Sequence, residues 1–160
     1  MELTEQNLAK AQETYRNLCA MMDEDDWKYQ KFEEDLVIRF TARGEDIPMD
    51  FLVVIDPYPG LIRLFSTLPF NMSKEKMIDS AIAVCAINDR LKNGTFDFDV
   101  SDGTIRFRMT QMYMDSEIGK DVFKYMVYCS AQTVDEYNDK FLMLSKGGLA
   151  INDFLADINK

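Results

Sequence analysis

The 160-residue sequence contains no histidine. Histidine is the usual proton shuttle near neutral pH, the commonest metal ligand and the base of Ser-His and Cys-His pairs. Its absence excludes most familiar catalytic and metal sites. The sequence also lacks a phosphate-binding glycine loop and any CxxC pair. We therefore expect no catalytic residue, no cofactor and no bound metal.

Positive charge and long apolar runs are also scarce. Lys and Arg total 18 against 28 Asp and Glu, a net charge of −10, which excludes a nucleic-acid binder that works by bulk charge. The longest uninterrupted apolar run, 81–87, is far shorter than a membrane span. Residues 1–8 are polar, with Glu2 and Glu5, unlike a signal peptide. We expect a cytoplasmic protein with no membrane or nucleic-acid partner.

Cysteine is limited to Cys19, Cys85 and Cys129, which are far apart in the chain. Each lies in an apolar helical pattern and their number is odd, so we expect three buried thiols in a reducing compartment. Apolar residues make up 47% of the chain, which is ordinary for a globular protein. A chain of this length buries roughly 70% of its unfolded surface without disulfides or metals. We expect one domain, 1–160.

Apolar residues recur every three or four positions in three long segments, which predicts helices over 4–22, 73–92 and 116–147. A short amphipathic helix follows at 151–158. In the second helix the expected inward stripe is Met77, Ile78, Ala81, Ile82, Cys85, Asn88 and Leu91. Because Asn88 is the amide on this stripe, we expect its side chain to hydrogen-bond nearby backbone.

Between these helices the apolar residues alternate, which predicts strands over 36–41, 50–56 and 61–68. Residues 27–32 suggest an additional short edge strand. A β-hairpin is predicted from the alternating runs 95–100 and 104–114, which Asp102-Gly103 separates. The fold class is therefore α+β, an antiparallel sheet with packed helices. The order is helix, three strands, helix, two strands, helix and a short C-terminal helix.

Acidic residues raise two chemical alternatives. The run from Asp97 to Gly103 resembles the start of a calcium loop, but its sixth position is Asp102 and its twelfth is Arg108, where an EF-hand needs Gly and Glu. The hairpin explains this run better. Glu33, Glu34 and Asp35 resemble a catalytic carboxylate cluster, but adjacent carboxylates near a strand are typical of a solvated edge.

Methionine is abundant, with eleven residues, and its flexible thioether suits surfaces that bind partners of varied shape. In the strand 104–114, Met112 and Met114 share the face of Arg106 and Arg108, opposite the face of Ile105. An interaction patch and burial under the N-terminal helix or a dimer partner are both open readings. The candidate partner contacts are Phe65, Met112, Met114, Phe154 and Leu155.

The sequence resembles the YbjN-like family, labelled sensory transduction regulators, whose fold is similar to that of class I type III secretion chaperones. The resemblance spans about 36–148. It is carried by the apolar helix that ends in Asn88, Gly94, the strand 96–99, the Asp102-Gly103 turn and the strand 105–108, and also by 64–76 and 135–147. It implies a compact α+β domain, a homodimer and no catalytic residues. Secretion chaperones of this fold are small acidic dimers that hold extended client segments.

The sequence thus favours a non-enzymatic protein-binding or regulatory module, chaperone-like in mode, that binds a protein partner through a sheet edge and apolar surface. One alternative is a small-ligand domain or an enzyme that works with carboxylates and Tyr, which needs a pocket holding a strongly perturbed Asp or Glu. Another alternative is a structural subunit of a larger assembly.

Overall fold

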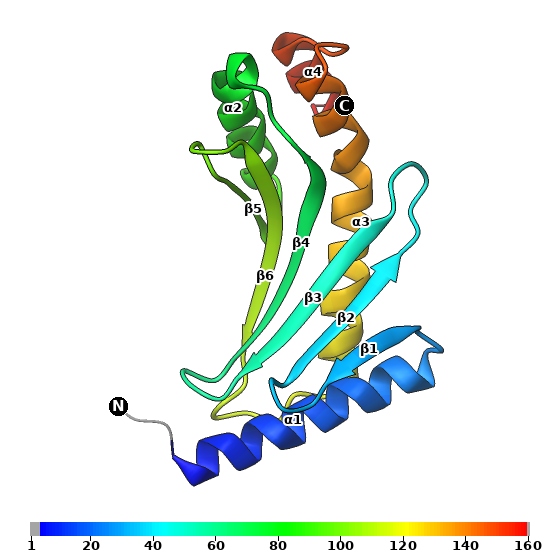
Figure 1. Cartoon of the computed structure of the whole chain (residues 1–160), viewed down its shortest axis with the longest axis vertical. Coiled ribbons are helices and arrows are strands. Elements are labelled where there is room, and N and C mark those ends of the chain that lie inside the picture. The colour runs from blue at the N-terminus through cyan, green and yellow to red at the C-terminus, as the bar shows by residue number, and fades with distance from the viewer. Residues whose placement is uncertain (1–3, 160) are drawn as a thin grey trace.

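The computed structural model describes residues 4–159 as an antiparallel sheet with helices packed against it (Figure 1). The order of elements confirms the predicted α+β fold. The elements are α1 (Glu5–Glu24), β1 (Tyr29–Phe32), β2 (Val37–Ala42), β3 (Met49–Asp56), β4 (Leu61–Asn71), the 3-10 turn η1 (Lys74–Lys76), α2 (Met77–Asn88), β5 (Thr95–Phe98), β6 (Thr104–Met112), α3 (Lys120–Ser145) and α4 (Ile151–Asp157).

The six strands form one sheet in the order β1-β2-β3-β4-β6-β5. Strands β1 to β4 are consecutive antiparallel neighbours, and β1 confirms the additional edge strand expected at 27–32. The β5-β6 hairpin joins this sheet because β6 pairs with β4, with Phe65 opposite Arg108. Its turn contains Gly103, whose φ of +80° suits the predicted Asp-Gly turn.

The helices pack around the sheet and around one another. In Figure 1, α3 runs behind the sheet, α1 crosses its lower end, and α2 and α4 lie beside each other at the top. Thr4 caps the N-terminus of α1, since its hydroxyl accepts a hydrogen bond from the Asn7 N–H at 3.2 Å. None of the helices in residues 4–159 combines the length and apolar composition needed to cross a bilayer.

The core lies between the helices and one face of the sheet. Alternate strand residues point into it, so that Ile38, Val53, Leu64 and Phe107 are almost fully buried. Burial of these side chains supplies the main stabilising free energy, at roughly 25 cal/mol per Å² of apolar surface. The sheet is therefore amphipathic, with an inner face in the core and an outer face in contact with solvent.

Aromatic rings connect the hairpin to the C-terminal helices. The ring of Phe96 lies 5.2 Å from that of Phe107 and 5.4 Å from that of Phe141, in edge-to-face geometry. The Phe154 ring of α4 is 5.8 Å from the Phe141 ring. Such pairs contribute about 0.5 to 1.5 kcal/mol beyond their buried area. This cluster fixes α3 and α4 against β5 and β6.

Two expectations about buried residues are wrong. In α2 the buried residues are Ser80, Ala83, Val84 and Ile87, whereas Ile78 is 77% exposed, so the predicted inward stripe faces largely outward. The helix is apolar on most sides, and its periodicity therefore does not select the face that packs. The cysteines also differ: Cys19 is buried, Cys129 is half-buried and Cys85 is exposed on the outer side of α2.

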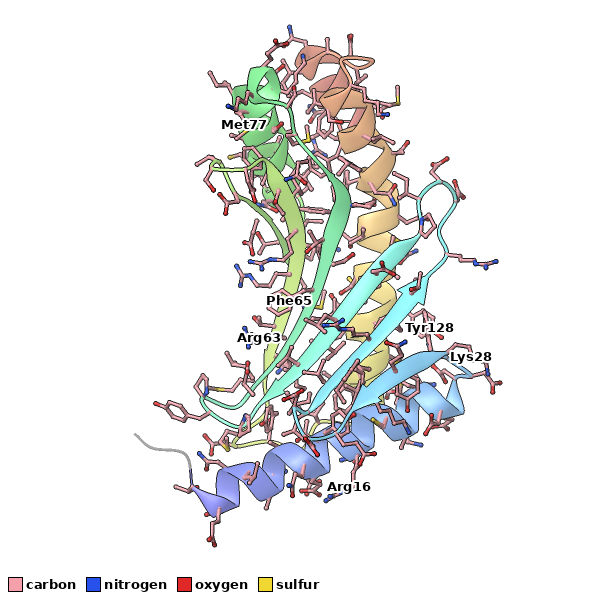
Figure 2. All side chains as sticks on the ribbon, in the orientation of Figure 1. Arg16, Lys28, Arg63, Phe65, Met77 and Tyr128 are labelled. Atoms are coloured by element: carbon pink, nitrogen blue, oxygen red, sulfur yellow. The ribbon has the colours of Figure 1, made fainter. Side chains whose placement is uncertain are left out.

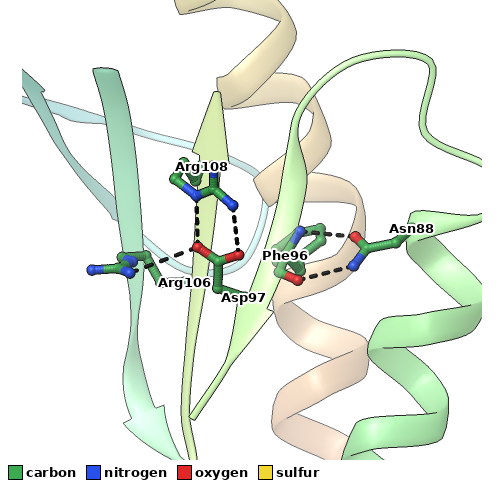
Figure 3. A network of polar contacts seen from close by, with 5 residues as sticks. All are labelled: Asn88, Phe96, Asp97, Arg106 and Arg108. Atoms are coloured by element: carbon green, nitrogen blue, oxygen red, sulfur yellow. Dashed lines mark hydrogen bonds and ion pairs between the residues drawn. The ribbon is translucent and has the colours of Figure 1, made fainter. Parts of the chain in front are cut away.

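The Asn88 side chain connects the end of α2 to β5, as expected. Its amide donates to the carbonyl oxygen of Phe96 at 2.9 Å, and its oxygen accepts from the Phe96 N–H at 2.8 Å (Figure 3). The Asn88 side chain thus satisfies the two backbone groups of Phe96 that a neighbouring strand would otherwise pair. The contact positions the edge strand β5 beside the helix.

Replacing Asn88 with Ala is expected to lower the free energy of unfolding by about 2 kcal/mol, because both backbone groups of Phe96 lose their partner in a half-buried position. Urea unfolding followed by circular dichroism measures the change. Asn152→Ala, at an exposed position of α4, is the matched control and should change stability by less than about 0.5 kcal/mol. Equal losses of stability in the two variants would contradict a stabilising role for the Asn88 hydrogen bonds to Phe96.

Candidate functional site

The outer face of the sheet is the first candidate surface. Its side chains come from the alternate residues of β2, β3, β4 and β6, and every one of them is at least partly exposed. No helix within residues 4–159 therefore lies across this face. Its outward residues include Arg39, Thr41, Asp50, Leu52, Val54, Arg63, Phe65, Thr67, Arg106, Arg108, Thr110 and Met112.

A groove of about 1370 Å³ lies on this face. It runs from the segment that enters β1, at Trp27 and Lys28, across β2 and β3 to Phe65 on β4 and Arg106 on β6. We call it the sheet groove. Small-molecule pockets are typically about 300 to 1,000 Å³ and largely enclosed. The sheet groove is larger and open, which suits a chain segment better than a metabolite.

Phe65 lies at the centre of the outer face (Figure 2). The guanidinium carbons of Arg63 and Arg106 lie 5.4 Å and 5.1 Å from the centroid of its ring. Both are cation–π contacts, which favour a cation over the electron-rich face of a ring. Phe65 thus presents an apolar ring edge between two positive groups.

Carboxylates on the same face hold some of these arginines in place. Asp97 accepts hydrogen bonds from Nε of Arg108 at 2.8 Å and from its second guanidinium nitrogen at 3.0 Å, and Arg106 approaches at 3.6 Å (Figure 3). Arg63 makes a similar two-point contact with Asp56. The hydrogen bond from Arg108 is the main reason that the pKa of Asp97 lies below its usual range.

The carboxylate of Asp97 does not suit the role of a general acid. A general acid needs a pKa raised towards neutrality, whereas the Arg108 contact lowers the pKa of Asp97. The cluster Glu33, Glu34 and Asp35 is exposed in the turn between β1 and β2. Residues 4–159 contain no group of three or more His, Cys, Asp or Glu placed to hold a metal ion.

A second candidate surface is the exposed side of α2. Ile78 is 77% exposed and Ile82, one turn later, is 43% exposed. Ala81 and Cys85 are exposed between and beyond them. Spacings of three and four residues place all four on one side of a helix. This apolar stripe of α2 is unpartnered within the described chain.

The structure separates the five predicted partner contacts. Phe65 and Met112 share the outer face of the sheet, and Met112 is 56% exposed. Met114 lies just beyond β6, where its side chain packs close to Gly60, and is half-buried. Phe154 is completely buried among α3 and α4, and Leu155 is half-buried on α4. Phe154 is therefore unavailable as a surface contact, and the five residues do not form one site.

The arginines of the sheet groove were not identified as a group from the sequence. The alternation of Arg106 and Arg108 with apolar residues showed only that both share one side of a strand. That Arg63 and Arg106 flank one phenylalanine depends on the pairing of β4 with β6. No local pattern contains this pairing, because the two strands are separated by α2 and β5.

The position of Phe154 can be tested by its effect on stability. Phe154→Ala is expected to lower the free energy of unfolding by about 3 to 5 kcal/mol, because it leaves a cavity beside Phe141. Met112→Ala should change it by less than about 0.5 kcal/mol, since Met112 is mostly exposed. Chemical unfolding of both variants measures the difference. A small effect for Phe154→Ala would show that α4 does not seal the core.

Comparison with known proteins identifies relatives of this chain. A family model named YbjN, "Putative bacterial sensory transduction regulator", matches residues 14–143. The match begins before the range 36–148 that the sequence motifs indicated. No curated protein matches the chain.

Among solved structures, a similar fold is found in YbjN, "a putative transcription regulator from E. coli". Its TM-score is 0.56 with 11% sequence identity, over 79% of this chain and 92% of that chain. At this identity the likeness concerns the fold alone. The family match covers most of the sequence, and the fold agrees with it. This chain belongs to the YbjN family, which is described as a family of regulators.

Proposed function

We propose that this protein is a non-catalytic regulatory module that acts by holding an extended segment of a protein partner in the sheet groove, in a chaperone-like manner. The observation that carries the proposal is the open outer face of the sheet, where the apolar side chains of Leu52, Phe65 and Met112 stand among polar ones. Leu52 and Phe65 are half-buried and line the sheet groove, and Met112 is exposed on the same face. Accessible apolar side chains on a hollowed face are typical of surfaces that bind proteins.

The edge of the sheet supports the same mode of binding. β1 is an outer strand of only four residues, and Gln30 in it lines the sheet groove. An extended segment lying there has unpaired backbone groups of β1 within reach, in addition to side-chain contacts. The protein would thus bind both the backbone of the segment, through hydrogen bonds to β1, and its side chains, through the sheet groove.

Photo-crosslinking tests the partner surface directly. A benzophenone amino acid placed at Thr67, which is exposed and lines the sheet groove, is expected to capture a protein in the native cell. The same group at Val100, which is 70% exposed in the β5-β6 turn, is the control and should give little product. The product at Thr67 should fall several-fold when Phe65→Asp is added. Equal crosslinking at the two positions, or none at Thr67, would overturn the proposal.

The module is further proposed to be a homodimer that pairs through the apolar stripe of α2. Ile78 is 77% exposed and Ile82 is 43% exposed on one side of α2, and adjoining exposed apolar residues are typical of interaction surfaces. The resemblance to small dimeric chaperones implies the same state. Two copies of one helix face contact each other naturally about a two-fold axis. In this arrangement the sheet groove of each copy stays open.

Ile78→Glu combined with Ile82→Glu is expected to abolish the dimer, because two like-charged carboxylates per copy would face their counterparts without water. Size exclusion with light scattering should give twice the 18.6 kDa chain mass for the wild type and one chain mass for the variant. Val100→Glu, at a similarly exposed residue, should remain dimeric. A monomeric wild type would contradict this interface.

A further inference from the structure

The arginines of this acidic chain gather on one surface. The chain has net charge −10 and seven arginines, of which Arg16 lies on α1 and Arg90 follows α2. The remaining five lie on the outer face of the sheet or directly after β2: Arg39, Arg43, Arg63, Arg106 and Arg108. A scattered distribution would place them on all surfaces. The outer face is thus a positive region on a negative protein.

The charge of the sheet groove is positive as well. Five cationic side chains line it against three carboxylates: Lys28, Arg39, Arg43, Arg63 and Arg106 against Asp25, Asp26 and Asp50. Asp25 is already paired with Lys124 at 2.7 Å, and Asp50 accepts a hydrogen bond from Thr41 at 2.6 Å. Within the part of the chain that the structure describes, Arg39 and Arg43 have no carboxylate at ion-pair distance. The Arg39 guanidinium lies 5.3 Å from the centroid of the Phe32 ring, a contact that leaves its N–H groups without a carboxylate partner. A carboxylate ligand can therefore pair with both guanidiniums.

Strand geometry sets the spacing of Arg39 and Arg43. Arg39 lies on β2 and Arg43 directly follows this strand, four residues further along the chain. At about 3.3 Å per residue, roughly 13 Å of extended backbone separates them. A compact anion cannot touch both. An extended chain that advances about 3.3 Å per residue covers this distance in about four residues.

The side chains beside Arg39 on the neighbouring strands are apolar. Leu52 lies opposite Arg39 and Phe65 opposite Leu52, and the Phe65 ring is flanked by Arg63 and Arg106. A matching ligand therefore carries acidic groups for the arginines and apolar groups for Leu52 and Phe65. Arginine binds carboxylates with two parallel hydrogen bonds, which adds geometric selectivity to the attraction.

A nucleic acid matches this surface poorly. Its evenly spaced phosphates would meet Asp50, Asp56 and Asp97, which lie among the arginines of the same face. A protein segment can place neutral or apolar residues at those points. The acidic side chains elsewhere on the chain repel either ligand only weakly once it lies on the outer face. Charges more than about 8 Å away are largely screened at physiological ionic strength.

We propose that the partner segment held in the sheet groove is acidic, an extended stretch rich in Asp and Glu with apolar residues between them, and that Arg39 and Arg43 bind its carboxylates. This inference rests on the proposed function and specifies the chemistry of its partner. The arginine contacts select for charge, and the central Leu52 and Phe65 accept the apolar side chains.

A selection from a displayed library of random 12-residue peptides on the full-length protein tests the inference without a known partner. The enriched peptides are expected to be rich in Asp and Glu. Their affinity, measured by fluorescence anisotropy, should fall at least ten-fold with Arg39→Gln and Arg43→Gln combined. It should also fall at least ten-fold when Gln and Asn replace the Glu and Asp of the peptide. Arg16→Gln, exposed on α1 away from the groove (Figure 2), is the matched control and should bind as the wild type does.

The outcomes separate this inference from the proposed function. One outcome would overturn the acidic specificity but leave a protein-binding groove. In that outcome the enriched peptides are neutral or basic, their affinity does not depend on Arg39 and Arg43, and Phe65→Asp abolishes their binding. A library that yields no peptide dependent on either set of residues would overturn both. A 20-nucleotide oligonucleotide that binds through Arg39 and Arg43 more tightly than any selected peptide would overturn the acidic segment in favour of nucleic acid.

Discussion

The pairing of β4 with β6 is the contact on which the rest of this structure depends. It joins the meander β1 to β4 to the hairpin β5-β6, and it places Leu64 opposite Met109 on the buried side. The chain between these strands includes α2, whose end the Asn88 side chain holds against β5. Without this pairing the chain would contain two small sheets, each too narrow to cover the length of α3.

The same pairing creates the outer face. Phe65 on β4 stands opposite Arg108 on β6, and Thr67 opposite Arg106. The cation–π contact of Arg106 with Phe65 therefore connects the two halves of the sheet, and Asp97 holds Arg106 and Arg108 within the hairpin. Surface ion pairs of this kind stabilise the fold little, typically by less than about 1 kcal/mol each. Their clearer consequence is to keep the guanidiniums of Arg63 and Arg106 ordered beside the half-buried ring of Phe65.

The separation of roles between the surfaces follows from this geometry. The helices cover the inner face, so stability comes from apolar burial there, and the outer face is free to vary in charge. Five of the seven arginines lie on or directly beside this face of an otherwise acidic chain, so the proposed acidic segment would be attracted to this face rather than to the other surfaces. The apolar stripe of α2 lies outside this face, so pairing of two copies there is compatible with two open grooves.

The secondary structure could be predicted from the sequence because its signals are local. Period-two alternation identified the strands, and Asp102-Gly103 identified the hairpin turn, whose geometry needs a residue with positive φ. The role of Asn88 was also predicted, since an amide on an apolar stripe must find backbone partners. The packed face of α2 was predicted wrongly, because Ile78 and Ile82 are as apolar as the buried Val84 and Ile87.

By itself, then, the sequence determined the element types, the antiparallel strands and the absence of histidine chemistry, since composition and period are properties of neighbouring residues. Only the tertiary structure decided that Phe154 is sealed in the core, that Ile78 faces outward and that five arginines share one surface. Each of these depends on which distant elements become neighbours, and that choice is made by the total buried apolar surface of the folded chain rather than by any local pattern.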